Sequence, residues 1–121
     1  MAKHTILVVD DSATDTMVIA APLRGEGYEV ITAKDGEEAL ARLASDTPDL
    51  VLLDVVMPGK NGFQLCRQIR NDSRYSGLPV ILLTSKNGEA DKFWGLKQGA
   101  TEYITKPFAS DTLLATVRRH I

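Results

Sequence analysis

The sequence has little cysteine, little aromatic content and no long apolar run. Its single cysteine, Cys66, cannot form an internal disulfide, which is typical of a reducing compartment. We therefore expect a cytoplasmic protein in which Cys66 is a small buried apolar group. No apolar run approaches the roughly 20 residues that span a bilayer, and residues 1–4 lead directly into the first apolar run. We expect neither membrane insertion nor a signal peptide.

Charge of one sign is not concentrated in any segment either. The net charge is −2, and the basic residues form no block. Because nucleic-acid binding needs a concentrated positive surface, we expect no nucleic-acid partner. The 121 residues are 44% hydrophobic and 25% charged, which is typical of one globular domain with its own core.

Four short apolar runs each end in a polar residue of a particular kind. They are Ile6 to Val9 before Asp10 and Asp11, Leu50 to Leu53 before Asp54, Val80 to Leu83 before Thr84, and Tyr103 to Thr105 before Lys106. Runs of this length, rich in β-branched residues, are typical of strands buried on both faces of a parallel sheet. Ligands of such sheets bind at the carboxyl ends of the strands. The polar residues are therefore expected to share one crevice.

Strands and helices alternate along the whole chain. We expect strands at 4–9, 28–33, 50–53, 78–83 and 102–105, with helices from Ser12 to about 25, then at 37–44, 63–70, 88–98 and from Ser110 to the C-terminus. Ser12 and Ser110 are the expected N-cap residues of the first and last helices. Five alternations of this kind predict an α/β domain with a single parallel sheet.

The sequence also gives expectations for the burial of apolar side chains in the first and fourth helices. In the first helix, we expect the apolar residues from Met17 to Leu23, Val18 included, to form one buried face, and Pro22 to kink or shorten the helix. In the fourth helix we expect Phe93 in the core. Trp94 fits equally well a core residue and an exposed docking residue.

The three carboxylates of Asp10, Asp11 and Asp54 indicate a metal site. Like charges brought together repel unless a cation lies among them, and Mg²⁺ prefers such oxygen ligands. A carboxylate held rigidly at a strand end can also attack phosphorus, while Lys106 can contact a phosphoryl oxygen. Taken singly, an Asp-Asp pair can simply cap a helix and Lys106 can be a solvated surface charge. Their joint occurrence favours a metal and phosphoryl site, where the Thr84 hydroxyl can donate to a phosphoryl oxygen.

The same residues resemble the receiver domain of two-component response regulators. The resemblance covers the whole chain and rests on five separated motifs: Asp10-Asp11, Asp54 to Pro58, Gly62, Thr84-Ser85 and Lys106-Pro107-Phe108. It implies a flavodoxin-like fold, in which a five-stranded parallel sheet of order 2-1-3-4-5 carries helices on both faces. It also implies a single receiver domain over residues 1–121, and we expect no output domain.

The resemblance implies a role for each site residue. Asp54 would accept a phosphoryl group from a histidine kinase. Mg²⁺ would be held by Asp10, Asp11, Asp54 and the backbone carbonyl of Val56. Lys106 would contact the phosphoryl group from a cis peptide bond to Pro107. On phosphorylation, Thr84 would move toward the phosphoryl group and Tyr103 would swing inward.

The expected output is a docking face for another protein. It would comprise the helix at 88–98, the strand at 102–105 and the last helix, which change together when Thr84 and Tyr103 move. Such a switch is not a turnover enzyme, because it catalyses only its own phosphorylation and dephosphorylation. A weaker resemblance, over Lys86 to Lys106, is to single-domain regulators of type IV pilus twitching systems, which implies a role in motility.

Two other functions remain open from the residues. One is a Mg²⁺-dependent phosphohydrolase of the haloacid dehalogenase type, but those enzymes need Asp-x-Asp after the first strand, whereas this chain has Asp10-Asp11-Ser12. The other is a receiver-like scaffold that is never phosphorylated. Incubation with acetyl phosphate and Mg²⁺ distinguishes the three: a stable adduct on Asp54, sustained phosphate release, or neither.

Overall fold

The expected parallel sheet is present. The computed structural model describes residues 3–121, which form β1 (Thr5–Val9), β2 (Glu29–Ala33), β3 (Leu50–Leu53), β4 (Val80–Thr84) and β5 (Glu102–Thr105). All neighbouring strands pair in parallel, in the order β2-β1-β3-β4-β5. The order implied by the resemblance is therefore confirmed.

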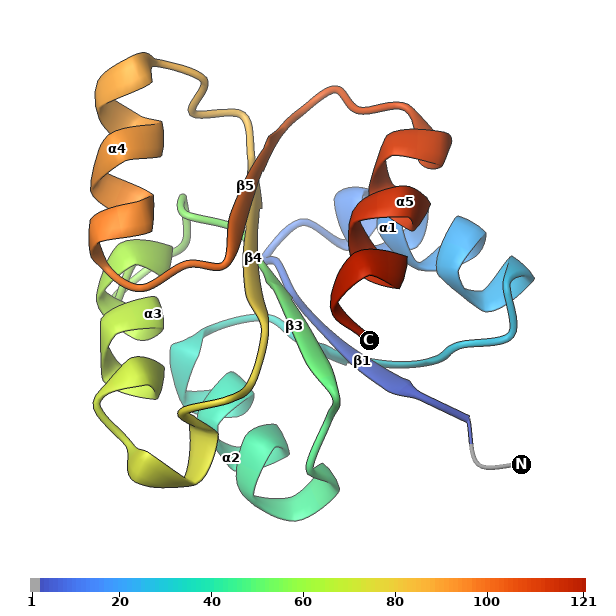
Figure 1. The fold of residues 1–121 in the computed structure, drawn as a ribbon, viewed down its shortest axis with the longest axis horizontal. Coiled ribbons are helices and arrows are strands. Elements are labelled where there is room, and N and C mark those ends of the chain that lie inside the picture. The colour runs from blue at the N-terminus through green and yellow to red at the C-terminus, as the bar shows by residue number, and fades with distance from the viewer. Residues whose placement is uncertain (1–2) are drawn as a thin grey trace.

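Helices cover both faces of this sheet. They are α1 (Ala13–Gly25), α2 (Gly36–Asp46), α3 (Gly62–Arg70), α4 (Glu89–Lys97) and α5 (Ser110–His120), with a short 3₁₀ helix, η1 (Ser73–Tyr75). Figure 1 shows α1 and α5 on one side of the sheet and α2, α3 and α4 on the other. Among residues 3–121, no helix is long and apolar enough to cross a membrane.

The strands contribute side chains to two separate apolar cores, one on each face of the sheet. Because side chains alternate along a strand, Leu7 and Val9 of β1 pack under α2 and α3, whereas Ile6 and Val8 pack under α1 and α5. Cys66 lies in the first of these cores and is fully buried, as expected. The burial raises the pKa of its thiol to about 11. Continuous apolar runs in the sequence thus reflect burial on both faces of the sheet.

The helix ends agree only partly with the sequence analysis. Ser12 is the N-cap of α1, where its hydroxyl accepts a hydrogen bond from the Asp15 amide at 3.2 Å. The expectation for Ser110 is wrong: it is the first residue of α5, and Ala109 occupies the cap position without a side-chain bond. At α3, Asn61 and Gln64 form a reciprocal capping box, which the sequence analysis missed.

The first helix reaches its expected end but buries other residues than expected. It continues past Pro22 to Gly25, and its last turn is closed by the Glu26 amide, which donates to the carbonyls of Pro22 and Leu23. Its apolar residues do not share one buried face, because Met17 and Val18 are 71% and 56% exposed. The side that meets the sheet carries Ile19, Ala20 and Leu23. The rotation of the helix on the sheet decides which residues are buried.

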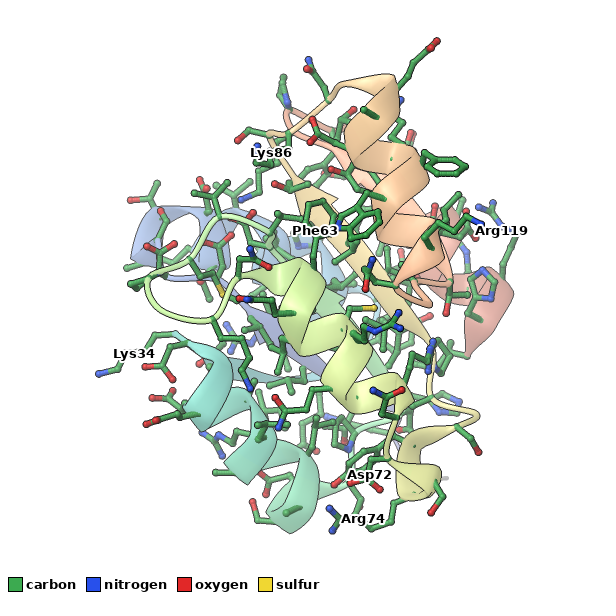
Figure 2. All side chains as sticks on the ribbon, turned by 90° about the vertical axis from the view of Figure 1, so that its left-hand side faces the viewer. Lys34, Phe63, Asp72, Arg74, Lys86 and Arg119 are labelled. Atoms are coloured by element: carbon green, nitrogen blue, oxygen red, sulfur yellow. The ribbon has the colours of Figure 1, made fainter. Side chains whose placement is uncertain are left out.

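The fourth helix is bound to the sheet through a glycine. Gly95 is its buried residue, and a Cβ there would lie 2.7 Å from the Leu82 side chain. Because this close approach turns the neighbouring positions outward, Phe93 is 62% exposed and the expectation that it belongs to the core is wrong. Trp94 is 54% exposed, which excludes its core alternative. It lines a groove between α3 and α4 together with Phe63, the residue of this groove that Figure 2 labels.

Candidate functional site

The polar residues at the strand ends meet at one edge of the sheet. The register pairs Val9 with Leu53, so that Asp10 and Asp54 follow neighbouring strands at the same level. Both are nearly buried, at 4% and 8% exposure, whereas Asp11 is exposed. One carboxylate oxygen from each of the three lies within 4.8 Å of the other two. This all-oxygen donor set suits a hard divalent cation such as Mg²⁺.

Backbone hydrogen bonds hold the two buried carboxylates in place. The Asp10 amide donates to Ala33 O at 3.0 Å, and its Oδ1 accepts from the Ser12 amide at 2.9 Å. The Asp54 amide donates to Val9 O at 2.9 Å, and its Oδ1 accepts from the Val56 amide at 3.2 Å. The chain turns directly after each strand, which directs both carboxylates into the crevice.

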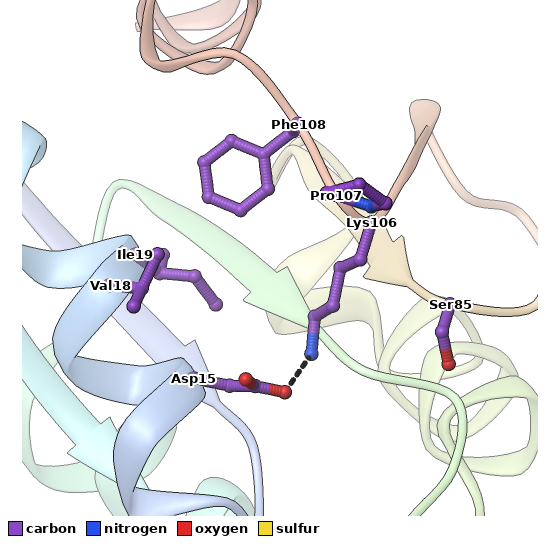
Figure 3. Close-up of a pocket in the computed structure, with 7 residues that line it drawn as sticks. All are labelled: Asp15, Val18, Ile19, Ser85, Lys106, Pro107 and Phe108. Atoms are coloured by element: carbon purple, nitrogen blue, oxygen red, sulfur yellow. Dashed lines mark hydrogen bonds and ion pairs between the residues drawn. The ribbon is translucent and has the colours of Figure 1, made fainter.

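Lys106 lies above this cluster and binds three carboxylates at once. Its Nζ donates to Asp10 Oδ2 at 2.7 Å, to Asp15 Oδ2 at 2.9 Å and to Asp54 Oδ2 at 3.2 Å. The peptide bond from Lys106 to Pro107 is cis, as the resemblance implied. Figure 3 shows the lysine side chain reaching from the β5–α5 loop to Asp15 on α1.

Asp15 is the site residue that sequence reasoning missed. It lies in the first turn of the helix that follows Asp10 and Asp11, and this position was the only available signal. A carboxylate in a first helical turn is ordinarily explained by the helix dipole, so nothing in the sequence distinguished it. Only the fold brings it to Lys106, 91 residues further along the chain.

Burial and charge shift the pKa values of the buried pair. Burial raises the pKa of Asp10 above its usual value, although the hydrogen bonds from Lys106 and the Ser12 amide oppose this effect. For Lys106, burial alone would lower the pKa, but the hydrogen bonds to Asp10 and Asp15 and the charge of Asp54 outweigh it and raise the pKa. Lys106 is therefore a cation at neutral pH.

Thr84 and Tyr103 are linked through the loop after β4. Thr84 is fully buried at the end of β4, and its Oγ1 accepts a hydrogen bond from the Lys86 amide at 3.3 Å. The Tyr103 hydroxyl donates to the Lys86 carbonyl at 2.6 Å. Burial, with the nearby charges of Asp91 and Asp54, raises the pKa of Tyr103 to about 12. The phenol is therefore a neutral donor at physiological pH.

The structure thus brings together the candidate residues Asp10, Asp11, Asp54, Thr84 and Lys106 at one edge of the sheet. The Val56 amide contacts the Asp54 carboxylate, while a metal contact of the Val56 carbonyl stays a prediction. The histidines pair elsewhere, His4 with Asp49 and His120 with Glu102.

The chain is similar to known proteins along most of its length. The sequence profile of the response regulator receiver domain matches residues 6–118. Protein PilH of Pseudomonas aeruginosa is 46% identical over 112 residues, covering 93% of both chains. Response regulator PleD of Caulobacter vibrioides is 46% identical over 113 residues, which are 93% of this chain but only 25% of PleD.

Solved structures show the same fold. Chemotaxis protein CheY4 of Vibrio cholerae superposes with a TM-score of 0.92 and 38% identity, covering 99% of this chain and all of the other. A response regulator described as putative, from Chloroflexus aurantiacus, gives a TM-score of 0.94 and 37% identity over 98% and 97% of the two chains. The chain therefore belongs to the response regulator receiver domain family, the phosphoacceptor signalling switches of two-component systems.

Proposed function

We propose that Asp54 is the phosphoacceptor of this switch and that its phosphorylation depends on Mg²⁺. The observation that carries the proposal is the position of the Asp54 carboxylate, which lies at a rigid strand end within 4.8 Å of two further carboxylates and 3.2 Å from an ammonium group. In phosphoryl transfer, positioning and charge neutralisation supply most of the catalysis. A cation and Lys106 would provide both at this carboxylate.

The transfer itself needs one nucleophile and one leaving group. A carboxylate oxygen of Asp54 attacks the phosphorus of a phosphohistidine on the kinase, the new O–P bond forms, and the P–N bond breaks to release the imidazole. Lys106 is placed to stabilise the negative charge that arrives on the phosphoryl oxygens. Asp10, Asp11, Asp54 and the Val56 carbonyl would hold the Mg²⁺. When bound, it supplies positive charge against three carboxylates that otherwise repel one another.

Phosphorylation would then alter the face formed by α4, β5 and α5. The Thr84 hydroxyl would turn toward the phosphoryl group, Tyr103 would follow inward, and a downstream protein would bind the changed face. This output is protein docking in the cytoplasm, without nucleic-acid binding and without turnover of an external substrate. The likeness to PilH and to the chemotaxis protein CheY4 supports a role in pilus-based or chemotactic motility.

Intact-mass spectrometry after incubation with acetyl phosphate and Mg²⁺ tests the proposal. We expect one added phosphoryl group per chain, and none in Asp54→Asn, which keeps the size of the side chain but removes the attacking carboxylate. Melting curves of the variant should show that it is folded. An equal adduct in Asp54→Asn would place the acceptor elsewhere. Sustained release of phosphate would support a hydrolase, and the absence of any adduct would support a scaffold.

A further inference from the structure

The carboxylate of Asp15 is built into the Lys106 site. Its backbone amide is held by the Ser12 hydroxyl at 3.2 Å, and Ser12 is in turn held by Asp10, which fixes the first turn of α1 against the strand end. The Asp15 side chain is 45% exposed, compared with 1% for Asp10 and 9% for Asp54. Of the three carboxylates on Lys106, Asp15 is the one that faces solvent.

The charges at this site do not balance without a further cation. Within residues 3–121, Lys106 is the only cationic side chain within 4.0 Å of Asp10, Asp15 or Asp54, and it serves all three. Asp15 has no other ion pair in this part of the chain. A phosphoryl group on Asp54 adds negative charge and needs the same ammonium. Asp15 and the phosphoryl group are therefore competitors for one lysine.

The ion pair between Asp15 and Lys106 lies in a cavity that is open to solvent. Asp15 and Lys106 line a cavity of about 390 Å³ between α1 and the β5–α5 loop, together with Val18, Ser85 and Phe108 (Figure 3). Part of the lining is apolar and the Lys106 side chain is only 15% exposed, so the contact between the carboxylate of Asp15 and the ammonium of Lys106 is partly shielded from water. Such an environment strengthens the ion pair compared with a fully hydrated one.

We propose that Asp15 is a positioning residue that holds Lys106 before phosphorylation and competes with the phosphoryl group for it afterwards. This inference rests on the proposed function of Asp54. It predicts that Asp15 slows phosphorylation, because Lys106 must leave it, and shortens the lifetime of the phosphoryl group, because Lys106 can return to it. Asp15 thus lowers both the rate at which the phosphorylated state forms and the lifetime of that state.

Removal of the Asp15 charge should increase the rate of phosphorylation and the lifetime of the phosphoryl group. Asp15→Asn should raise the second-order rate constant of phosphorylation by acetyl phosphate about threefold to fivefold, the size expected for a partly exposed ion pair. The half-life of phospho-Asp54 after donor removal should lengthen in the same variant. The affinity for trifluoroberyllate, a phosphoryl analogue, should rise by a similar factor when titrated with Mg²⁺ and followed by ¹⁹F NMR.

Two further variants separate positioning from other effects. Asp15→Glu keeps the charge and should restore rates near those of the wild type. Asp111→Asn removes the same charge from the first turn of α5, where the carboxylate is exposed and has no ion pair in the described chain, and should leave the rates unchanged.

The outcomes are distinct. Unchanged or slower phosphorylation of Asp15→Asn would overturn the inference, as would an equal gain in Asp111→Asn, which would show only an effect of net charge. Wild-type protein that takes up no phosphoryl group would instead defeat the proposed function of Asp54.

Discussion

The Tyr103 hydroxyl donates a 2.6 Å hydrogen bond to the backbone carbonyl of Lys86, while the Lys86 amide donates to the buried Thr84 hydroxyl. Lys86 is therefore held from both sides by the two expected switch residues. The Tyr103 ring also packs against α4, since a Cβ on Gly95 would lie 2.9 Å from it. We therefore expect a movement of Thr84 to reach the loop before α4 and β5 through these direct contacts.

Removal of the Thr84 hydroxyl should separate phosphorylation from its structural effect. We expect Thr84→Ala to accept a phosphoryl group on Asp54, because the hydroxyl is not a nucleophile there, but to lose most of the change at α4. Trp94 is the only tryptophan of the chain and lies exposed on α4, so its fluorescence can report that change. Phosphorylation should alter the emission of the wild type and leave that of the variant nearly constant.

A suitable control is Thr112→Ala on α5, an exposed threonine whose hydroxyl makes no hydrogen bond within the described residues. It should behave as the wild type. An undiminished fluorescence change in phosphorylated Thr84→Ala would show that the signal reaches α4 by another route.

Removal of metal should stop phosphorylation. Asp10, Asp11 and Asp54 repel one another without a cation, so excess EDTA should abolish the acetyl phosphate adduct and added Mg²⁺ should restore it. Asp11 is exposed, so Asp11→Ala should fold normally and need at least about tenfold more Mg²⁺ for half-maximal rate. The same change at the exposed Glu37 should have no effect. Full-rate phosphorylation in EDTA would contradict the metal site.

Gly62, the first residue of α3, should tolerate no side chain. A Cβ there would lie 2.1 Å from the Asp54 carbonyl oxygen and 2.7 Å from Val55 Cα, so the backbone would have to move. We expect Gly62→Ala to lower the free energy of unfolding by about 2–3 kcal/mol, as measured by urea titration. Gly25→Ala, where the Cβ meets open space in α1, should change it by less than about 1 kcal/mol. Equal effects would show that Gly62 is not closely packed.

Acid should remove the contribution of Glu102 to stability. Burial acts to raise the Glu102 pKa, but hydrogen bonds from Arg119 and His120 outweigh it and lower the pKa below its usual 4.5. A lowered pKa in the folded state means that the contribution is present above pH 4.5 and is lost as the pH falls through the folded value.

We therefore expect Glu102→Gln to melt at a lower temperature than the wild type at pH 7, with a difference that shrinks as the pH falls below 4.5. Glu29→Gln, at an exposed position without an ion pair in the described chain, should melt like the wild type at every pH. A difference that persists unchanged in acid would mean that the lost contacts are not ionic.

The strands and the residues at their ends were readable from the sequence because both are local. Strands at 50–53 and 102–105 have the bounds that were expected, and each is followed directly by a charged residue. A parallel sheet then requires Asp10, Asp54 and Lys106 to share one edge. The resemblance to receiver domains added the strand order, which periodicity does not contain.

The three-dimensional packing decided the remainder. The sequence shows that Met17, Phe93 and Trp94 are apolar residues of helices. The rotation of each helix against the sheet determines whether such residues are buried. The Ser110 hydroxyl could cap a helix, yet α5 begins with this residue, because the path of the chain after Pro107 sets the start. Asp15 reaches Lys106 across 91 positions of sequence. Asp10 follows a strand, so the sheet alone places it near Lys106, whereas Asp15 lies on a helix, and only the packing of that helix on the sheet brings its carboxylate to Lys106.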